Sequence, residues 1–442
     1  MIKLPEQVNK AICLLKNSGF EAYAVGGAVR DCLLGKVPFD WDITTSARPE
    51  ETEKVFCGER IIETGIKHGT VTVIIDDMPL EITTYRIDGD YTDHRHPQTV
   101  SFSDNLRDDL SRRDFTINTL CCNCDDKIID AFGGKDDLNN KIIRCVGDPD
   151  TRFSEDALRI MRAVRFSAEL GFTIEKSTSD SILKNRRLLS DVSKERLQVE
   201  FTKLITGKYA TDVIRKYHAV IEVFIPELAP LVECEQHTKY HKYDVFEHTL
   251  HAVDAIDFTD RILRLTMFFH DFGKPDAKTT DENGTSHFKG HAVISEKKTR
   301  DILKRLKFDN NTINEVSKLV LIHDMKSPRD KIQAKKMMCS LGDEAYLNLI
   351  KIKRADNMAK ADPHAIDEKL KNMRSFYEEI KINNECYNLK SLAVNGDDIK
   401  AFGIAEGKEI KSSLDFLLNG VIEGKCQNRK DELLEYLKEN TK

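Results

Sequence analysis

Residues 22–45 read AYAVGGAVRDCLLGKVPFDWDITT, and this stretch predicts both a fold and a binding site. The apolar run 22–25 is typical of a buried strand, and residues 28–34 continue with helical spacing. Gly26 and Gly27 lie between the two. Glycines at a strand-to-helix turn let the backbone approach an anion and point N–H groups at it. The pattern therefore predicts a phosphate-binding turn.

Two carboxylates follow this turn. Asp40 and Asp42 flank Trp41, and in a strand residues i and i+2 project from the same face. Neighbouring carboxylates repel each other, and a hard divalent cation is their usual compensation. A phosphate-binding turn beside such a pair predicts metal-assisted phosphoryl chemistry on a nucleotide. The alternative is a glycine turn followed by two surface acids.

The two motifs together resemble a known family. G-G-x-V-R-D at 26–31 followed by D-x-D at 40–42 resembles the class II tRNA nucleotidyltransferases and bacterial poly(A) polymerases, within the polymerase-β-like superfamily. The resemblance implies an α+β fold, in which a nucleotidyltransferase head with a small mixed sheet is followed by all-helical parts. It also implies that Gly26, Gly27 and Arg30 bind the nucleotide and that Asp40 and Asp42 hold Mg²⁺.

Composition limits the choice of protein class. The chain has 442 residues, enough for two to four domains, with 40% hydrophobic and 32% charged residues. No apolar run approaches the roughly 18 residues of a membrane span, and the N-terminus does not resemble a signal peptide. The eleven cysteines are scattered, which indicates reduced thiols in a cytoplasmic protein. The net charge of −6 gives no independent support for RNA binding.

The motifs divide the chain into four expected parts. Residues 1–150 are the α/β head, 151–215 a helical neck, 216–365 a helical body containing an HD domain, and 366–442 a helical tail.

A third carboxylate lies in the strand-like run LEITTYR at 80–86. Glu81 could complete a two-metal site or be an edge-strand glutamate, and spacing does not separate these readings. The resemblance favours the metal site, because related enzymes carry an acid in an E-x-T-T-x-R strand. The polar segment 86–105 then predicts a long loop, in which His94 and His96 are expected to make polar contacts. In the family this loop accompanies A addition, which argues against an enzyme that adds only C.

Residues 112–118 read RRDFTIN. Adjacent arginines flanked by acids could form surface ion pairs. The resemblance instead implies that Arg113 and Asp114 contact the sugar and phosphates of the incoming nucleotide, with Asn118 in support.

The run SEDALRIMRAVRFSAELGF predicts one helix from Ser154, as N-cap, to Gly171. On that helix Asp156 and Arg159 would share a face. The arginines need anionic partners, and an internal salt-bridge network is one possibility. The resemblance gives another, because E-D-x-x-R is the family's base-selecting motif; it also brings Arg162 and Arg165 near the nucleotide.

The base-selecting role has a simple chemical basis. Cytosine and adenine each present an amino donor beside a ring-nitrogen acceptor, so a carboxylate accepts from the amine while an arginine donates to the nitrogen. Uracil and guanine reverse that pattern and would leave buried polar groups unpaired. One Asp/Arg pair would therefore select both CTP and ATP without a nucleic-acid template.

Histidines concentrate between residues 218 and 323. The order H…HD…D resembles the HD-domain signature of metal-dependent phosphohydrolases, whose ligands would be His248, His270, Asp271 and Asp356. They could hold a divalent transition metal that activates water. His291 and His323 could extend the site to a second metal. Such domains also persist as inactive scaffolds.

These observations lead to one expected function and three alternatives. The resemblance implies a CCA-adding tRNA nucleotidyltransferase that uses CTP, ATP, Mg²⁺ and tRNA, engages neither DNA nor a membrane, and contacts tRNA through its tail. The alternatives are an A-adding enzyme, a poly(A) polymerase, and an HD-type phosphohydrolase with a degenerate head.

Overall fold

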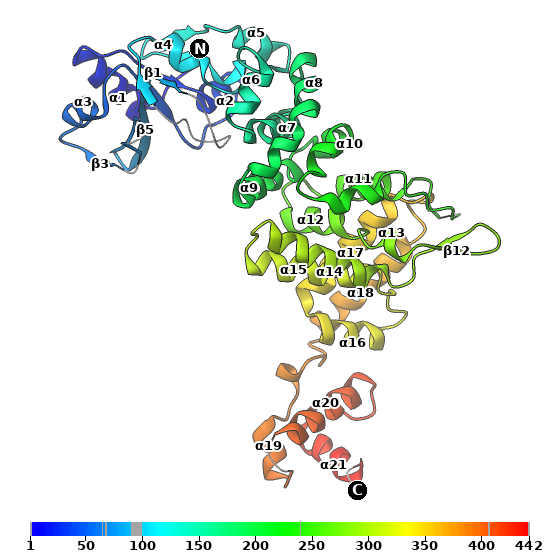
Figure 1. The fold of residues 1–442 in the computed structure, drawn as a ribbon. Helices are drawn as coiled ribbons and strands as arrows, with labels where there is room; N and C mark the ends of the chain where they lie inside the picture. Colours follow the sequence, from blue (N-terminus) through cyan, green and yellow to red (C-terminus); the bar gives the residue numbers. More distant parts are fainter. Residues whose placement is uncertain are drawn as a thin grey trace. The chain divides into compact units, whose positions relative to one another are not determined.

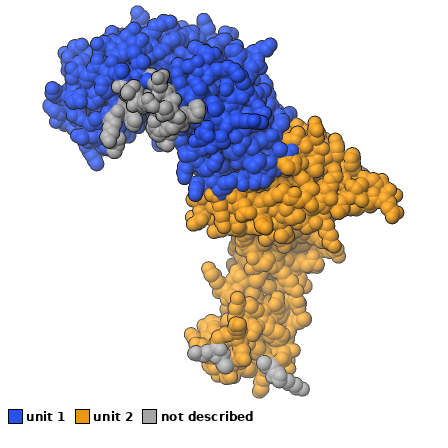
Figure 2. Space-filling model, viewed as in Figure 1, with its two compact units in different colours: residues 1–229, 305–307 blue, residues 230–304, 308–442 orange. Residues whose placement is uncertain are grey.

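The computed structural model describes residues 2–63, 65–66, 69–89, 100–238, 240–404 and 407–440. These form two compact units, residues 1–229 with 305–307 and residues 230–304 with 308–442 (Figure 2). Among the described residues, no helix combines the length and apolar character that crossing a bilayer requires. The division into four parts stays a prediction.

The first unit is built on a mixed seven-stranded sheet in the order β3-β4-β5-β2-β1-β8-β9. Figure 1 labels its strands β1, β3 and β5. Only the pair β2–β5 is parallel, and the other neighbours are antiparallel. The strands are β1 (Ala22–Val25), β2 (Asp42–Thr45), β3 (Arg60–Ile62), β4 (Thr70–Ile75), β5 (Met78–Thr84), β8 (Cys121–Cys122) and β9 (Ile128–Ile129). The expected α+β head is therefore confirmed.

Helices accompany the sheet and continue beyond it. With the sheet lie α1 (Glu6–Asn17), α2 (Gly27–Leu33), α3 (Pro49–Val55), α4 (Leu106–Ser111), η2 (Thr116–Asn118) and α5 (Gly134–Asn139). Beyond it come α6 (Pro149–Glu155), α7 (Leu158–Leu170), α8 (Lys176–Asn185), η3 (Arg186–Asp191), α9 (Lys194–Ile205), α10 (Ala210–Ile221) and η4 (Pro226–Leu231). The short strands β10 (Ile142–Ile143) and β11 (Thr173–Ile174) pair in parallel.

The turn between β1 and α2 has the geometry that its glycines suggest. Gly26 has φ +82° and ψ −138°, a backbone region that is essentially restricted to glycine. A Cβ there would also lie 3.3 Å from an Arg113 nitrogen. Gly26 therefore allows both the turn and the close approach of a guanidinium.

Two sequence expectations were wrong in detail. The predicted loop at 86–105 begins and ends in an antiparallel ribbon of β6 (Arg86–Asp88) and β7 (Val100–Phe102). His94 and His96 lie outside the described residues.

The single helix expected from Ser154 to Gly171 is two helices, α6 and α7, although it does end at Gly171 in the left-handed conformation. Asp156 separates them, with φ −134° and ψ 101°. Asp148 and Pro149 start α6 early, so Ser154 lies inside α6 and is not a cap. Asp156 therefore does not share a helical face with Arg159.

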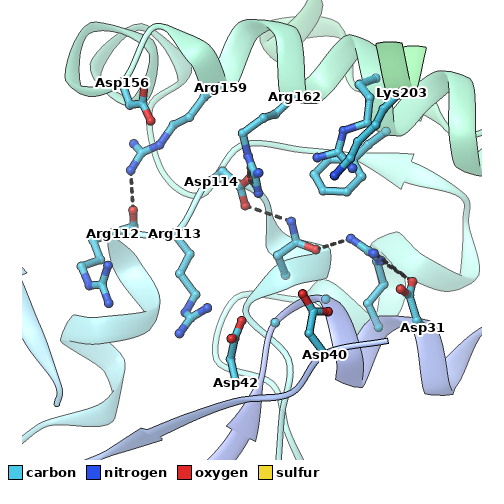
Figure 3. A pocket seen from close by; sticks show the side chains of 16 residues that line it. Asp31, Asp40, Asp42, Arg112, Arg113, Asp114, Asp156, Arg159, Arg162 and Lys203 are labelled. Atoms are coloured by element: carbon cyan, nitrogen blue, oxygen red, sulfur yellow. Dashed lines mark hydrogen bonds and ion pairs between the residues drawn. The ribbon is translucent and has the colours of Figure 1, made fainter. Parts of the chain in front are cut away.

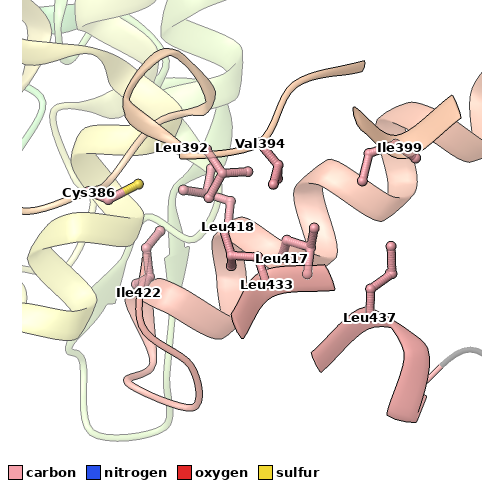
Figure 4. Packing of buried hydrophobic residues seen from close by; sticks show 9 residues of the cluster. All are labelled: Cys386, Leu392, Val394, Ile399, Leu417, Leu418, Ile422, Leu433 and Leu437. Carbon is pink, nitrogen blue, oxygen red and sulfur yellow. The ribbon is translucent and has the colours of Figure 1, made fainter. Parts of the chain in front are cut away.

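The second unit is almost entirely helical. It contains α11 (Val245–Asp254), α12 (Arg261–Phe269), α13 (Lys274–Ala277), α14 (His291–Arg305), α15 (Asn310–Ile322), α16 (Lys331–Leu341), α17 (Asp343–Met358) and α18 (Asp367–Ile382), with a small β12–β13 hairpin (Thr279–Thr280, Ser286–His287). Towards the C-terminus follow η5 (Leu389–Ser391), α19 (Gly396–Ala401), α20 (Lys408–Ile422) and α21 (Lys430–Asn440). These last helices share an apolar cluster that includes Leu417, Leu418 and Leu433 (Figure 4).

Candidate functional site

A cavity of about 490 Å³ in the first unit gathers most of the residues that the head motifs predict (Figure 3). Its lining includes Gly26, Gly27, Arg30, Asp31, Asp40, Asp42, Arg112, Arg113, Asp114, Asn118, Asp156, Arg159, Arg162, Arg165, Phe166 and Lys203. Seven cationic side chains face five carboxylates in this lining, so the cavity suits an anionic ligand.

The acidic end of the cavity is formed by neighbouring strands. Asp42 begins β2 and is paired in register with Glu81 on β5, while Asp40 precedes the strand. Glu81 thus lies beside Asp42, although it does not line the cavity. Burial, together with the neighbouring Glu81 and Asp40 carboxylates, raises the pKa of Asp42 to about 6 against the opposing effect of Arg113. Carboxylates that repel one another in this way fit a bound divalent cation, which relieves the repulsion.

Asp109, to which the sequence analysis gave no role, holds Arg113 near the acidic end of the cavity. Asp109 is fully buried, and its oxygens bind Arg112 and Arg113 and accept a hydrogen bond from Thr44 on β2. Burial alone would raise the pKa of Asp109, but Arg113 and Arg112 outweigh it and lower the pKa. Arg113 Nε is buried without a hydrogen-bond partner among the described residues, so the guanidinium retains a donor. The i, i+3 and i, i+4 spacing of Asp109 to the two arginines was the available sequence signal.

A hydrogen-bond chain crosses the floor of the cavity. Arg30 donates to Asn118 at 2.8 Å, Asn118 donates to Asp114 at 2.9 Å, and Arg162 donates to the other oxygen of Asp114 at 2.8 Å. The Arg30 guanidinium also lies 4.8 Å from the centroid of the Phe166 ring. These contacts fix two arginines without occupying all of their donors.

Asp156 and Arg159 lie at another side of the same cavity (Figure 3). Asp156 accepts hydrogen bonds from the Leu158 amide at 3.1 Å and from Arg196 at 2.9 Å. Arg159 is 8% exposed; it donates to Glu155 at 2.6 Å and to the Arg112 carbonyl at 2.7 Å. The structure therefore brings the predicted pair together through a helix break, where sequence reasoning had expected a shared helical face. Arg165 is directed by Glu169 and Glu200, each at 2.8 Å.

A second cluster of metal-binding residues lies in the second unit. His248 (α11), His270 and Asp271 (after α12) form one group, and Asp271, His291 (α14) and His323 (after α15) form another. Asp356 on α17 joins the first group, with Oδ1 at 3.0 Å from His248 Nε2. All six predicted residues therefore meet at one centre.

The ring orientations suit metal ligation. The Nδ1 atoms of His248, His270, His291 and His323 lie 2.6–3.2 Å from the backbone carbonyls of Ala359, Met267, Phe288 and Val320. With Nδ1–H donating to these carbonyls, each Nε2 presents a lone pair to the centre. The Nε2 atoms of His291 and His323 are only 3.1 Å apart, and two lone pairs at that distance repel unless a cation or proton lies between them. The donor set therefore fits divalent transition-metal ions.

Comparison with known proteins agrees with the cavity. The model of the "Poly A polymerase head domain" matches residues 22–144, that of a "Probable RNA and SrmB- binding site of polymerase A" matches 171–231, and a putative "tRNA nucleotidyltransferase domain 2" model matches 279–437. A CCA-adding enzyme of Bacillus velezensis is 34% identical over 424 residues, covering 96% of this chain and 95% of the relative.

The chain belongs to the family of CCA-adding enzymes. Another CCA-adding enzyme, from Geobacillus kaustophilus, is 33% identical over 442 residues, and the match covers 99% of this chain and 97% of the relative. The Bacillus stearothermophilus CCA-adding enzyme, solved in complex with CTP, superposes with a TM-score of 0.72 at 30% identity, over 98% of this chain and 96% of that one. The Thermotoga maritima CCA-adding enzyme shares the fold with a TM-score of 0.65 at 21% identity. As a family member, the protein is a nucleotidyltransferase.

The floor of the cavity generates a prediction about stability. Burial alone would raise the pKa of Asp114, but Arg162 and Asn118 outweigh it and lower the pKa to about 2. A carboxyl with a lowered pKa stabilises the fold above its unfolded pKa and loses that contribution as pH falls towards 2. Asp114→Asn should therefore cost about 2 kcal/mol of unfolding free energy at pH 7. Denaturant titration at pH 7, 5 and 3.5 should give equal penalties at the first two values and a smaller one at the third.

Asp125→Asn is a suitable control, because Asp125 is exposed and its penalty should be close to zero at every pH. A penalty for Asp114→Asn that has already disappeared at pH 5 would contradict this account.

Proposed function

We propose that this chain is a CCA tRNA nucleotidyltransferase, which adds C, C and A from CTP and ATP to the 3′ end of tRNA without a nucleic-acid template. The observation that carries this proposal is the single cavity in which an acidic pair, several arginines and an Asp/Arg pair lie together. The acidic pair supports phosphoryl transfer, and the arginines support binding of a triphosphate. The Asp/Arg pair supports selection of the base.

In the transfer step, the 3′-hydroxyl of tRNA attacks the α-phosphate of the nucleotide and pyrophosphate leaves. Asp40 and Asp42, with Glu81 beside them, would hold Mg²⁺; when bound, this cation favours the attacking alkoxide and neutralises charge on the phosphates. The amides at Gly26 and Gly27 and the guanidinium of Arg30 would orient the triphosphate. The guanidinium of Arg113, which lines the cavity, would donate to the sugar or a phosphate.

Base selection would use the protein alone. The Asp156 carboxylate accepts from the exocyclic amine of cytosine or adenine, and Arg159 donates to the adjacent ring nitrogen. Arg196 supports this role, because its bond to Asp156 holds the carboxylate in place. Arg159 must exchange its contact with the Arg112 carbonyl or Glu155 for the base, which provides a means of accommodating two bases of different size.

The remaining predictions follow from this function. We infer that the chain acts in the cytoplasm, that residues 1–150 and 151–215 are the head and neck, and that the tail at 366–442 contacts tRNA. The solved relatives include CCA-adding enzymes in complex with tRNA, CTP and ATP. These complexes of related enzymes support the proposal that tRNA, CTP and ATP are the partners of this chain.

The decisive experiment uses three tRNAs that end before the CCA, after C and after CC. With CTP and ATP supplied singly and together, sequencing of the 3′ ends should show completion to CCA from all three and no further addition. Asp42→Asn should reduce the rate at least 100-fold, because it removes a metal-binding charge next to the reacting phosphate. Asp77→Asn, an exposed turn residue outside the cavity, should retain the wild-type rate.

Other products would identify other enzymes. Extension of only the CC-ended tRNA would indicate an A-adding enzyme, and a long A tract would indicate a poly(A) polymerase.

We further propose a metal-dependent phosphohydrolase activity at the second centre. The favouring observation is the inward orientation of four imidazole rings around Asp271, whose Oδ2 lies 3.0 Å from His270 and whose Oδ1 lies 3.4 Å from His291. One carboxylate thus faces both ligand groups. Burial and the neighbouring His270 lower the pKa of His323 to about 3, so this ring is neutral and able to bind a metal. A bound transition metal would activate water for attack on a phosphate ester.

This proposal predicts separable activities. The wild-type chain should retain a divalent transition metal after gel filtration, measured by elemental analysis, and should release phosphate from a phosphomonoester or open a 2′,3′-cyclic nucleotide. His270→Ala should lose both properties and keep CCA addition. His287→Ala, which changes an exposed histidine of β13, is the matched control. Equal hydrolysis by wild type and His270→Ala across several metals would reject the activity.

A further inference from the structure

One cation of the nucleotide cavity belongs to none of the motifs discussed above. Lys203 lines the cavity from α9, and its side chain is exposed. All six arginines of the lining have a carboxylate partner, as the pairs Arg30–Asp31, Arg112–Asp109, Arg113–Asp109, Arg159–Glu155, Arg162–Asp114 and Arg165–Glu200. Among the described residues, the side-chain ammonium of Lys203 has no hydrogen bond or ion pair. Its charge is therefore available to a ligand.

The position of Lys203 follows from the face of α9 on which it lies. Arg196, Glu200 and Lys203 occur at i, i+4 and i+7, so they line one face of the helix. Arg196 binds Asp156, and Glu200 binds Arg165. This face of α9 therefore holds two residues of the cavity, Asp156 and Arg165, and it also contributes Lys203 to the cavity lining.

Distance along the helix indicates which part of a nucleotide Lys203 would meet. Seven residues of α-helix correspond to about 10 Å, so Lys203 lies about that far along α9 from the arginine that holds Asp156. Figure 3 draws Lys203 across the cavity from Asp156 and Arg159, beyond Arg162, while Asp40 and Asp42 lie along the lower edge of the same cavity. A nucleotide whose base meets Asp156 and whose α-phosphate lies at the acidic pair would extend its β- and γ-phosphates past that pair.

We propose that Lys203 binds the β- or γ-phosphate of the incoming nucleoside triphosphate, and thereby favours triphosphates over monophosphates whichever base is bound. This inference rests on the proposed function. A lysine ammonium is a compact charge on a flexible stem, which suits phosphate oxygens whose position shifts between a bound CTP and a bound ATP. The nearest alternative ligand is the phosphate backbone of the tRNA primer.

The test is a kinetic comparison of wild type, Lys203→Ala and Lys203→Arg. Lys203→Ala should raise the KM for both CTP and ATP about tenfold, since one charge-assisted bond is lost. Its kcat should change less than twofold, because the bond forms before the chemical step and persists through it. The KM for tRNA and the affinity for CMP should be unchanged, whereas inhibition by pyrophosphate should weaken in parallel with the nucleotide KM.

Lys203→Arg should recover most of the loss, and Lys208→Ala, an exposed lysine outside the cavity, should behave as wild type. Because Lys203 is exposed and its side-chain ammonium has no partner among the described residues, its replacement should leave the unfolding midpoint unchanged, which excludes a folding defect. A rise in the KM for tRNA alone would overturn the inference and assign Lys203 to the primer. If the wild type is active and Lys203→Ala has unchanged KM values for CTP and ATP, the inference about Lys203 is also overturned. A wild type that neither binds CTP nor extends tRNA would instead refute the proposed function.

Discussion

The site depends on one electrostatic constraint, the crowding of acids at the start of β2. Asp42 lies in register with Glu81 on the only parallel pair of the sheet, close to Asp40, and burial together with this crowding raises its pKa to about 6. The arrangement is costly without a cation. Gly26 leaves room for Arg113 to approach Asp42, and the buried Asp109 holds Arg113 in place. The fold therefore places one positive charge, that of Arg113, beside the acids. A bound metal and the substrate would neutralise the remaining negative charge.

The base-reading side of the cavity depends on a different constraint, the interruption between α6 and α7. If α6 and α7 were one continuous helix, the helix itself would set the direction in which the Asp156 carboxylate points. Asp156 instead lies in extended backbone, where its side chain is fixed by the Leu158 amide and by Arg196 on α9. Arg159 follows in the first turn of α7, so the two groups approach from different backbone segments. α9 therefore directs two charged groups of the cavity, Asp156 through Arg196 and Arg165 on α7 through Glu200.

Much of this organisation could be predicted from local sequence. The turn at Gly26 and Gly27 was predictable because a strand, two glycines and a helix each leave a local pattern, and the acids followed from the alternation within a strand. The centre around Asp271 was predictable because its ligands occur in recognisable motifs. The break at Asp156 was missed because apolar spacing continues across it, whereas the contact that holds the Asp156 side chain comes from Arg196, 40 residues later. Asp109 was missed although its spacing to Arg112 and Arg113 was a local signal. Lys203 was missed because its position at the cavity arises from tertiary packing, which a single charged residue does not reveal.

The central claim is that one cavity made of protein accepts both CTP and ATP and rejects the other two nucleotides. Equilibrium competition on the protein without tRNA measures this directly. Labelled CTP should bind with a stoichiometry of one, ATP should displace it completely, and UTP and GTP should displace it at least 100-fold more weakly, since they leave Asp156 and Arg159 unpaired. Two independent sites for CTP and ATP, or displacement by UTP as effective as by ATP, would contradict the account.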